Sequence, residues 1–119
     1  MTGLATEWVR CRHWLVPALE RSQRFFSEAD VVDGLVQGTY FLRGGKASAI
    51  VYTLTEYPMA KAMVFLLAGG ALEDIAELET DLIEHARTLG CDRVEFCGRR
   101  GWTRALGYTE AFCIGIKDI

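Results

Sequence analysis

Residues 62–97 read AMVFLLAGGALEDIAELETDLIEHARTLGCDRVEFC, and this stretch does most to decide the fold. The unbroken apolar run Ala62–Leu67 predicts a central β-strand that is covered on both faces. The segment Ala71–Leu89 repeats apolar residues every three or four positions, which predicts a long amphipathic helix, and Gly90 is suited to end it. In Arg93–Cys97 apolar and charged residues alternate, which predicts a second strand. This order of elements indicates an α/β or α+β protein.

Patterns of the same kind, followed outward from this stretch, predict further helices and strands. Ser27 is a suitable N-cap and Gly38 a suitable stop for a helix between them. The glycine-rich residues 44–46 predict a hairpin turn, and Pro58 breaks the strand that follows it. The elements expected outside the central stretch are helices over Pro17–Arg24, 27–38 and Trp102–Leu106, and strands over Thr39–Arg43, Ala47–Thr55 and Ala111–Ile116.

The composition predicts one globular domain over residues 1–119, since half of the residues are hydrophobic and 24% are charged. The formal net charge of -3 gives no general attraction to nucleic acid or to an acidic membrane surface. No apolar run approaches the roughly 18 residues of a membrane span. The first ten residues contain Glu7 and lack the apolar core of a secretion signal. We therefore expect a cytoplasmic protein that does not bind membranes.

The cysteines allow two interpretations. Cys11 with His13, and Cys91 with Cys97, could together supply four zinc ligands. No CxxC pair is present, however, and the ligand pairs of structural zinc sites usually lie closer together in the sequence. Small buried thiols are therefore the preferred interpretation, and we expect neither a metal site nor a disulfide scaffold.

The second half of the chain resembles the GNAT superfamily of N-acetyltransferases. The resemblance rests on the strand Ala62–Leu67, its glycine turn, the long helix, the string GCDRVEF, and RALGY before the closing strand. Gly107-Tyr108 stands where the family usually has Gly-Phe, and GRRGW at 98–102 is similar to small GNAT-like proteins of phages and prophages. The resemblance implies a mixed, mainly antiparallel central sheet flanked by helices. The family's additional first strand would be missing here or reduced to Glu7–Arg10.

The resemblance also implies where acetyl-CoA would bind. GNAT proteins hold its pyrophosphate at the turn between the central strand and the long helix, where free N–H groups and the helix dipole attract an anion. The corresponding residues here are Leu67, Ala68, Gly69, Gly70 and Ala71. The family's opening Arg or Gln is absent, and the turn is short. Two acidic residues, Glu73 and Asp74, follow in the first turn of the helix, where they would repel a phosphate. The alternative is that the two glycines serve only a tight strand-to-helix turn.

The catalytic candidates are few. Many GNAT proteins place a tyrosine as general acid a few residues before the Gly-Phe aromatic, and the residue five before Tyr108 is Thr103. Glu56, at the end of a predicted strand, is the nearest candidate for a general base, and its alternative is a solvated turn residue. His13 can titrate near neutral pH, and the sequence assigns it no role.

Three arginines lie close together around an aromatic residue. Arg99, Arg100 and Arg104 surround Trp102 within six positions, although the chain as a whole is acidic. Guanidinium groups bind phosphates and carboxylates, and an indole can stack on a base or on an arginine. The patch could therefore contact a CoA phosphate, a nucleic acid or an acidic partner. The alternative is that its arginines pair with the acidic long helix and that Trp102 belongs to the core.

These features favour a degenerate GNAT-fold protein of phage or prophage type, which acts as a binding or virion-assembly accessory through a protein partner or self-assembly. It would lie in the cytoplasm of a host cell or in a virion and need no cofactor. The alternative is an acetyl-CoA-dependent N-acetyltransferase with a shortened cofactor loop, and a weaker one is a nucleic-acid-binding module. In GNAT proteins the strands that start here at Ala62 and Arg93 splay apart to admit the cofactor, so a fully paired ladder would exclude it.

Overall fold

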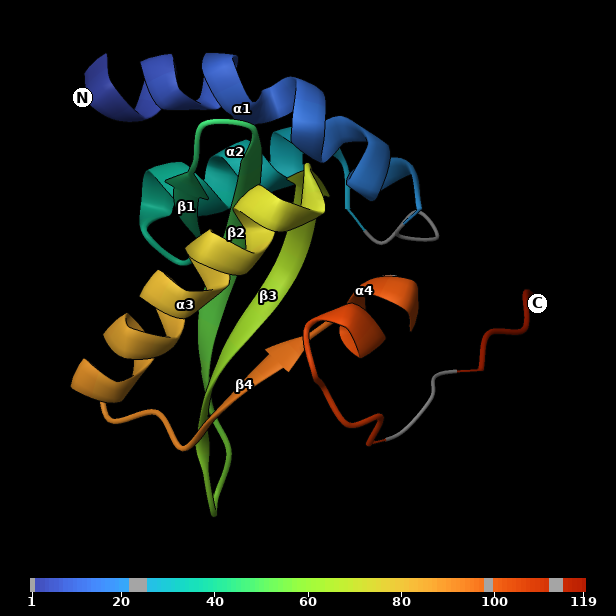
Figure 1. The fold of residues 1–119 in the computed structure, drawn as a ribbon. Helices are drawn as coiled ribbons and strands as arrows, with labels where there is room; N and C mark the ends of the chain where they lie inside the picture. The colour runs from blue at the N-terminus through green and yellow to red at the C-terminus, as the bar shows by residue number, and fades with distance from the viewer. Residues whose placement is uncertain (1, 22–25, 98–99, 112–114) are drawn as a thin grey trace.

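A computed structural model describes residues 2–21, 26–97, 100–111 and 115–119. The first half of the chain forms two helices and a β-hairpin, and the second half forms the long strand, the long helix and a shorter strand and helix (Figure 1). In chain order the elements are α1 (Thr2–Glu20), α2 (Glu28–Gln37), β1 (Phe41–Gly44), β2 (Ser48–Glu56), β3 (Lys61–Gly70), α3 (Leu72–Thr88), β4 (Arg93–Phe96) and α4 (Arg100–Ala105).

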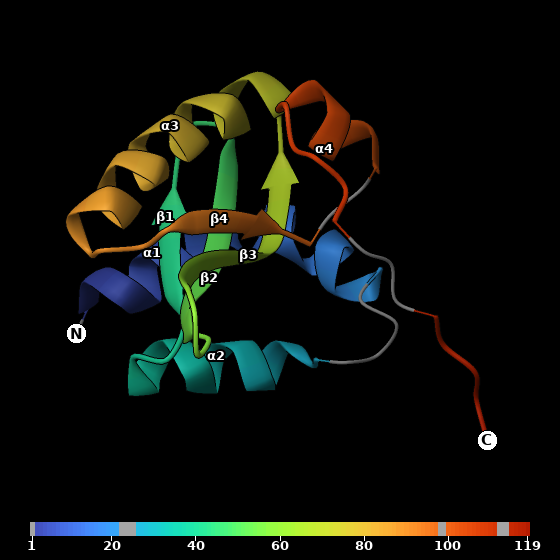
Figure 2. The ribbon, with the colours of Figure 1, turned by 90° about the horizontal axis from the view of Figure 1, so that it is seen from below.

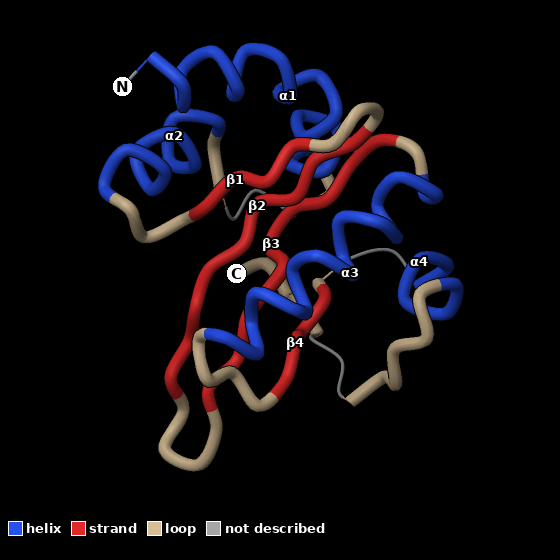
Figure 3. Tube along the Cα trace, turned by 60° about the vertical axis from the view of Figure 1, so that its left-hand side comes forward, coloured by secondary structure: helices blue, strands red, loops and turns tan. Residues whose placement is uncertain are grey.

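The four strands form one mixed sheet in the order β1-β2-β3-β4. The first three strands are antiparallel, and β4 is parallel to β3. The expected mixed, mainly antiparallel sheet with flanking helices is thus confirmed. In the tube view β2 and β3 form a long hairpin, and β1 and β4 flank opposite ends of it (Figure 3). No helix among the described residues is long and apolar enough to cross a membrane.

The sheet lies between two helical layers, with α1 and α2 on one face and α3 and α4 on the other (Figure 2). On the first face, the buried residues of α1 pack against β2 and β3. On the second face, α3 buries Ile75, Leu78, Leu82 and Ala86, which are part of the stripe that the sequence predicted. The run that starts at Ala62 is covered on both faces, as expected for a central strand.

The N-terminal prediction was wrong in two respects. Residues 2–20 form one helix, so no reduced strand occurs at Glu7–Arg10, and the helix predicted over Pro17–Arg24 is only the last turn of a longer one. Pro17 lies inside α1, although a proline there removes one backbone hydrogen bond. Because Trp8, Cys11, Leu15 and Leu19 all face the sheet at helical spacing, their burial outweighs this cost.

The other boundaries agree closely with the sequence, with two exceptions. The glycine turn expected after Leu67 is part of β3, where residues 68–70 pair with β2. Ser27 and Asp30 form the capping box of α2, and Gly38 ends this helix with a positive φ of 78°. The predicted closing strand at Ala111–Ile116 is not formed at residues 111, 115 and 116, which have no regular structure. Its middle, 112–114, lies outside the described residues.

Candidate functional site

The turn between β3 and α3 is where the resemblance places a cofactor, and the chain's own backbone covers it. Gly69 lies directly beneath α1, because a Cβ at this position would overlap the carbonyl oxygen of Trp14. Gly70 has a φ of 110°, and a Cβ there would overlap the backbone of Ala47 and Ser48. The N–H of Ala71 donates to the carbonyl of Ala47 at 2.9 Å. These glycines are therefore required by close backbone packing.

An internal carboxylate lies at the same turn. The side chain of Asp74, in the first turn of α3, accepts hydrogen bonds from the N–H of Ala47 at 3.0 Å and from the hydroxyl of Ser48. The Ser48 hydroxyl, followed by the backbone N–H of Ala47, lowers the pKa of Asp74. Gly45 leaves room for this carboxylate, since a Cβ there would overlap it. The start of α3 thus binds the β1–β2 hairpin through a carboxylate that belongs to the chain itself.

The first N–H groups of α3 keep some capacity for an anion. The N-cap residue Ala71 makes no side-chain cap, and the first backbone bond of the helix runs from Ile75 to Ala71. The N–H groups of Leu72, Glu73 and Asp74 therefore have no acceptor within the helix. Glu73 is exposed beside them and adds a second negative charge. The dipole of α3 is thus already faced by two carboxylates.

Strand β4 pairs with β3 over its whole length, which covers only the first half of β3. Four residues of each strand pair, from Ala62↔Arg93 to Phe65↔Phe96, and the N–H of Cys97 donates to the carbonyl of Phe65. β4 ends at Phe96, whereas β3 continues to Gly70, so the second half of β3 has no β4 partner among the described residues. Helix α4 lies beside this upper part of β3 (Figure 1). Its Trp102 packs against the core cluster that contains Phe65, so an aromatic side chain belongs to this region.

The predicted catalytic residues lie on different elements, and the structure does not bring them together. Glu56 is exposed at the end of β2, where it lies opposite Lys61 in the backbone register of the hairpin. Thr103 lies on α4 and is half-buried. His13 is exposed on α1, on the opposite side of the sheet, with its ring 4.4 Å from that of Trp14. No acid–base pair arises from these three residues.

The predicted arginine patch is only partly described. Arg99 lies outside the described residues, and Arg100 is placed only as the first residue of α4. Arg104 is exposed in the last turn of this helix. Trp102 is half-buried and packs on the core, as one of the two interpretations predicted. An exposed indole among the arginines is therefore not observed.

The cysteines proposed as alternative zinc ligands are separated by the sheet. Cys11 is buried in the α1 layer, and Cys91 packs in the α3 layer. His13 is exposed on α1, whereas Cys97 follows β4. Among the residues that the structure describes, no three His, Cys, Asp or Glu side chains form a group suited to a metal ion. The four residues do not form one site.

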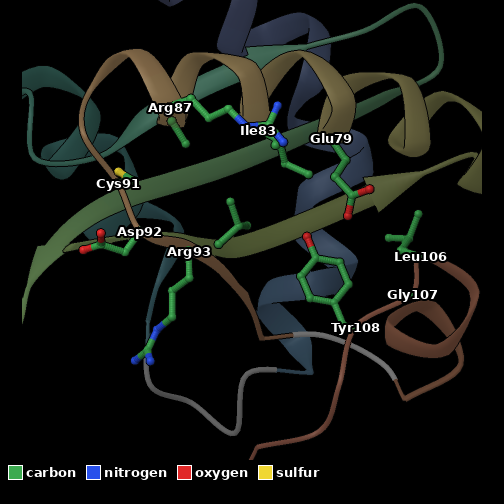
Figure 4. A pocket seen from close by; sticks show the side chains of 11 residues that line it. Glu79, Ile83, Arg87, Cys91, Asp92, Arg93, Leu106, Gly107 and Tyr108 are labelled. Atoms are coloured by element: carbon green, nitrogen blue, oxygen red, sulfur yellow. The ribbon is translucent and has the colours of Figure 1, made fainter. Parts of the chain in front are cut away.

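A cavity of about 320 Å³ lies along the second half of α3 (Figure 4). One wall is the outward face of the second half of this helix, with Glu79, Ile83 and Arg87. The other walls are the turn into β4 and the segment 106–108 after α4. The volume is at the lower end of the range for small-molecule sites, so the cavity suits a small ligand rather than a nucleotide cofactor.

Two polar atoms point toward each other across this cavity. The phenol oxygen of Tyr108 and Oε2 of Glu79 come from opposite walls (Figure 4). Both atoms are buried, and neither has a hydrogen-bond partner in the part of the chain that is described. Burial, and then the adjacent Glu79 carboxylate, raises the pKa of Tyr108, so the phenol stays protonated at neutral pH. Such unpartnered groups are rare in folded proteins and call for an explanation.

Sequence reasoning missed this pair. The sequence-based expectations give Glu79 no role, and Tyr108 enters them only at the position of the family's Gly-Phe aromatic. No local signal distinguishes Glu79 from its acidic neighbours, because the cavity is made by segments that are distant in the sequence.

Comparisons with known proteins support the fold and no family. No protein-family model and no curated protein matches this sequence. Two solved structures of TTHA1254 from Thermus thermophilus, the wild-type protein and a point variant, are similar, with TM-scores of 0.51 and 0.53. Each is 13% identical, and the match covers 69% of this chain and 71% of that one. At this level of identity the likeness to TTHA1254 shows that this α+β architecture occurs in a solved protein, and it shows nothing of function.

Proposed function

We propose that this chain is a binding protein with a GNAT-like fold that does not transfer acetyl groups from acetyl-CoA. The observation that supports this most is the Asp74 carboxylate, which takes two hydrogen bonds from the β1–β2 hairpin beside the turn where the pyrophosphate would lie. A bound phosphate there would face both Asp74 and the exposed Glu73. The arrangement stabilises the fold and disfavours an external anion.

A second candidate function is the N-acetyltransferase with a shortened cofactor loop. Two observations favour it: β4 ends opposite Phe65 while β3 continues to Gly70, and the first N–H groups of α3 have no acceptor within the helix. Against it stand the Trp102 side chain in the neighbouring core cluster and the scattered positions of Glu56, Thr103 and His13. The protein partner, the phage or prophage origin and the virion-assembly role stay predictions from the resemblance.

Calorimetric titration of acetyl-CoA tests this proposal. The wild-type protein is compared with Glu73→Gln, which removes one charge beside the free N–H groups of α3, and with Glu77→Gln, which neutralises an exposed carboxylate farther along the same helix. We expect no saturable heat with any of the three proteins. Saturable binding of acetyl-CoA to the wild-type protein, tighter in Glu73→Gln and unchanged in Glu77→Gln, would contradict the proposal and support the acetyltransferase.

A further inference from the structure

The cavity between α3, β4 and residues 106–108 carries an inference beyond the proposed function. It lies along the second half of α3, from Glu79 to Arg87, whereas Asp74 lies in the first turn of this helix. Its two inward-pointing polar atoms, Oε2 of Glu79 and the phenol oxygen of Tyr108, are buried without partners among the described residues. A carboxylate oxygen in this situation lacks the donor that would offset the loss of its hydration.

The remaining charged side chains of the cavity are engaged elsewhere. Arg93 forms an ion pair with Glu95 at 2.8 Å and lies over the ring of Tyr57. Asp92 accepts a hydrogen bond from the N–H of Lys61 at 2.9 Å. In the close view, the side chains of Arg93 and Asp92 point away from the Glu79–Tyr108 pair (Figure 4). Arg87 lies 3.6 Å from Glu84 and is exposed. Among the charged residues that line the cavity, Glu79 has a buried carboxylate oxygen without a partner in the described structure, and Arg87 adds an exposed positive charge.

The donors and acceptors of this pair determine the kind of ligand. A carboxylate only accepts hydrogen bonds, and a phenol can both donate and accept. An ammonium group has three N–H donors and no acceptor, so one ammonium between the two walls can donate to both oxygens. Its positive charge also compensates Glu79, whereas a carboxylate or phosphate ligand would be repelled by it. The ring of Tyr108 adds an aromatic surface close to the cation.

The walls determine the rest of the ligand. Ile83, Ala86, Val94 and Leu106 line the cavity and offer apolar contacts to a short hydrocarbon chain. A volume of about 320 Å³ has room for a few carbon atoms beside the ammonium group. We propose that this cavity binds a small primary amine, with its ammonium group between Glu79 and Tyr108 and its alkyl chain against the apolar wall.

The probe for this test is n-butylamine, titrated into the millimolar range at neutral pH, with 1-butanol and butyrate as comparators of the same chain length. Binding is followed by NMR of the methyl groups, because Ile83, Val94 and Leu106 lie in the cavity whereas Val36 on α2 lies outside it. We expect saturable shifts of the cavity methyls with the amine, weaker binding of the alcohol and none of butyrate. Equal binding of amine and alcohol, or binding of butyrate, would overturn the proposal.

Variants of both walls localise the ammonium group. Glu79→Gln keeps the shape of the side chain and removes the charge, so we expect the dissociation constant for n-butylamine to rise at least about tenfold. Tyr108→Phe should raise it less, and the control Glu77→Gln should leave it unchanged. Unchanged affinity in both Glu79→Gln and Tyr108→Phe would overturn the proposal. So would an absence of saturable shifts in the wild-type protein, which would mean that water alone occupies the cavity.

This test is separate from that of the proposed function. Failure of n-butylamine to bind would refute the amine site and leave the acetyl-CoA result at the start of α3 untouched. Saturable binding of acetyl-CoA would refute the proposed function while the methyl shifts at Ile83 still report on the cavity.

Discussion

Two carboxylates of α3, one at its start and one near its middle, are in opposite situations. At its start, Asp74 lies against the β1–β2 hairpin and has hydrogen-bond donors from two of its residues. Five residues farther along the helix, Glu79 points into a cavity opposite Tyr108 and its Oε2 has no partner among the described residues. The residue chemistry is the same, and the neighbours differ: a hairpin that supplies donors to Asp74, and apolar walls with one phenol around Glu79. The turn where the resemblance to GNAT proteins would place a cofactor thus carries a carboxylate whose donors come from the chain itself, and the unfilled space lies along the second half of α3.

The largest expected effect is at the turn before α3. Gly69→Ala places a Cβ against the carbonyl oxygen of Trp14, which belongs to the backbone of α1 and cannot move without displacing that helix. We expect a loss of at least about 3 kcal/mol in the free energy of unfolding, measured by urea denaturation. The control Gly3→Ala has nothing within 4 Å of the new Cβ and lies in α1. It should stabilise by up to about 1 kcal/mol. Equal free energies of unfolding for the two variants would show that the backbone of α1 does not pack against Gly69.

The next effect concerns the Asp74 carboxylate and its pH dependence. The pKa of Asp74 is lowered in the folded protein. This carboxylate therefore stabilises the fold at pH values above the pKa of the unfolded chain, which is about 4. The stabilisation is lost as the pH falls through the lower folded pKa. Asp74→Asn should therefore be less stable than wild type at pH 7, and its stability should fall less steeply below about pH 4. Urea denaturation across this range measures both slopes. The control Glu77→Gln should lose stability with falling pH as steeply as the wild-type protein does. The same steep loss in Asp74→Asn would contradict the expectation.

A smaller effect of opposite sign is expected at the cavity. Tyr108→Phe removes a buried hydroxyl that has no partner in the described structure, so we expect the free protein to gain about 1 kcal/mol. Tyr57→Phe is the matched control, because the Tyr57 hydroxyl donates to Glu95 at 3.0 Å and its loss should not stabilise. Thermal unfolding without any added amine compares the two. Destabilisation by Tyr108→Phe would mean that its hydroxyl is satisfied and that the cavity does not differ from the start of α3 in this respect.

The smallest effect tests the N–H groups at the start of α3. Ala71 has the extended conformation of an N-cap and no side chain that can cap. Ala71→Ser supplies a hydroxyl for an N–H of the first turn and should stabilise by about 0.5 to 1 kcal/mol. Ser27→Ala, which removes an existing cap from α2, should lose a similar amount. No gain in Ala71→Ser, with the expected loss in Ser27→Ala, would show that these N–H groups are already occupied.

The sequence predicted the elements that local patterns determine. The apolar stripe of α3, the doubly covered β3 and the capping residues of α2 all lie within single segments, and the structure confirms them. The start of α1 was missed because Pro17 is typical of a first helical turn. Only the sheet, which buries Trp8 and Cys11 on one face of α1, shows that the helix continues through it.

The candidate site was harder to predict for a physical reason. The resemblance drew attention to Gly69 and Gly70, whose role depends on Trp14 and Ala47, and these contacts exist only in the folded protein. Glu79 and Tyr108 are 29 positions apart in the sequence, and no periodic pattern connects them. A cavity forms where elements distant in the sequence leave space between them, so the pattern within one segment does not predict it.

Because the Asp74 carboxylate and the exposed Glu73 lie at the start of α3, we expect that acetyl-CoA does not bind there. The most direct measurement is a two-dimensional 1H–15N NMR titration of the wild-type protein with acetyl-CoA, read at the amides of residues 69–75. We predict that none of these amides shifts in a saturable way up to millimolar cofactor. Saturable shifts centred on Ala71, Leu72 and Glu73 would contradict the account and identify the turn as a working cofactor site.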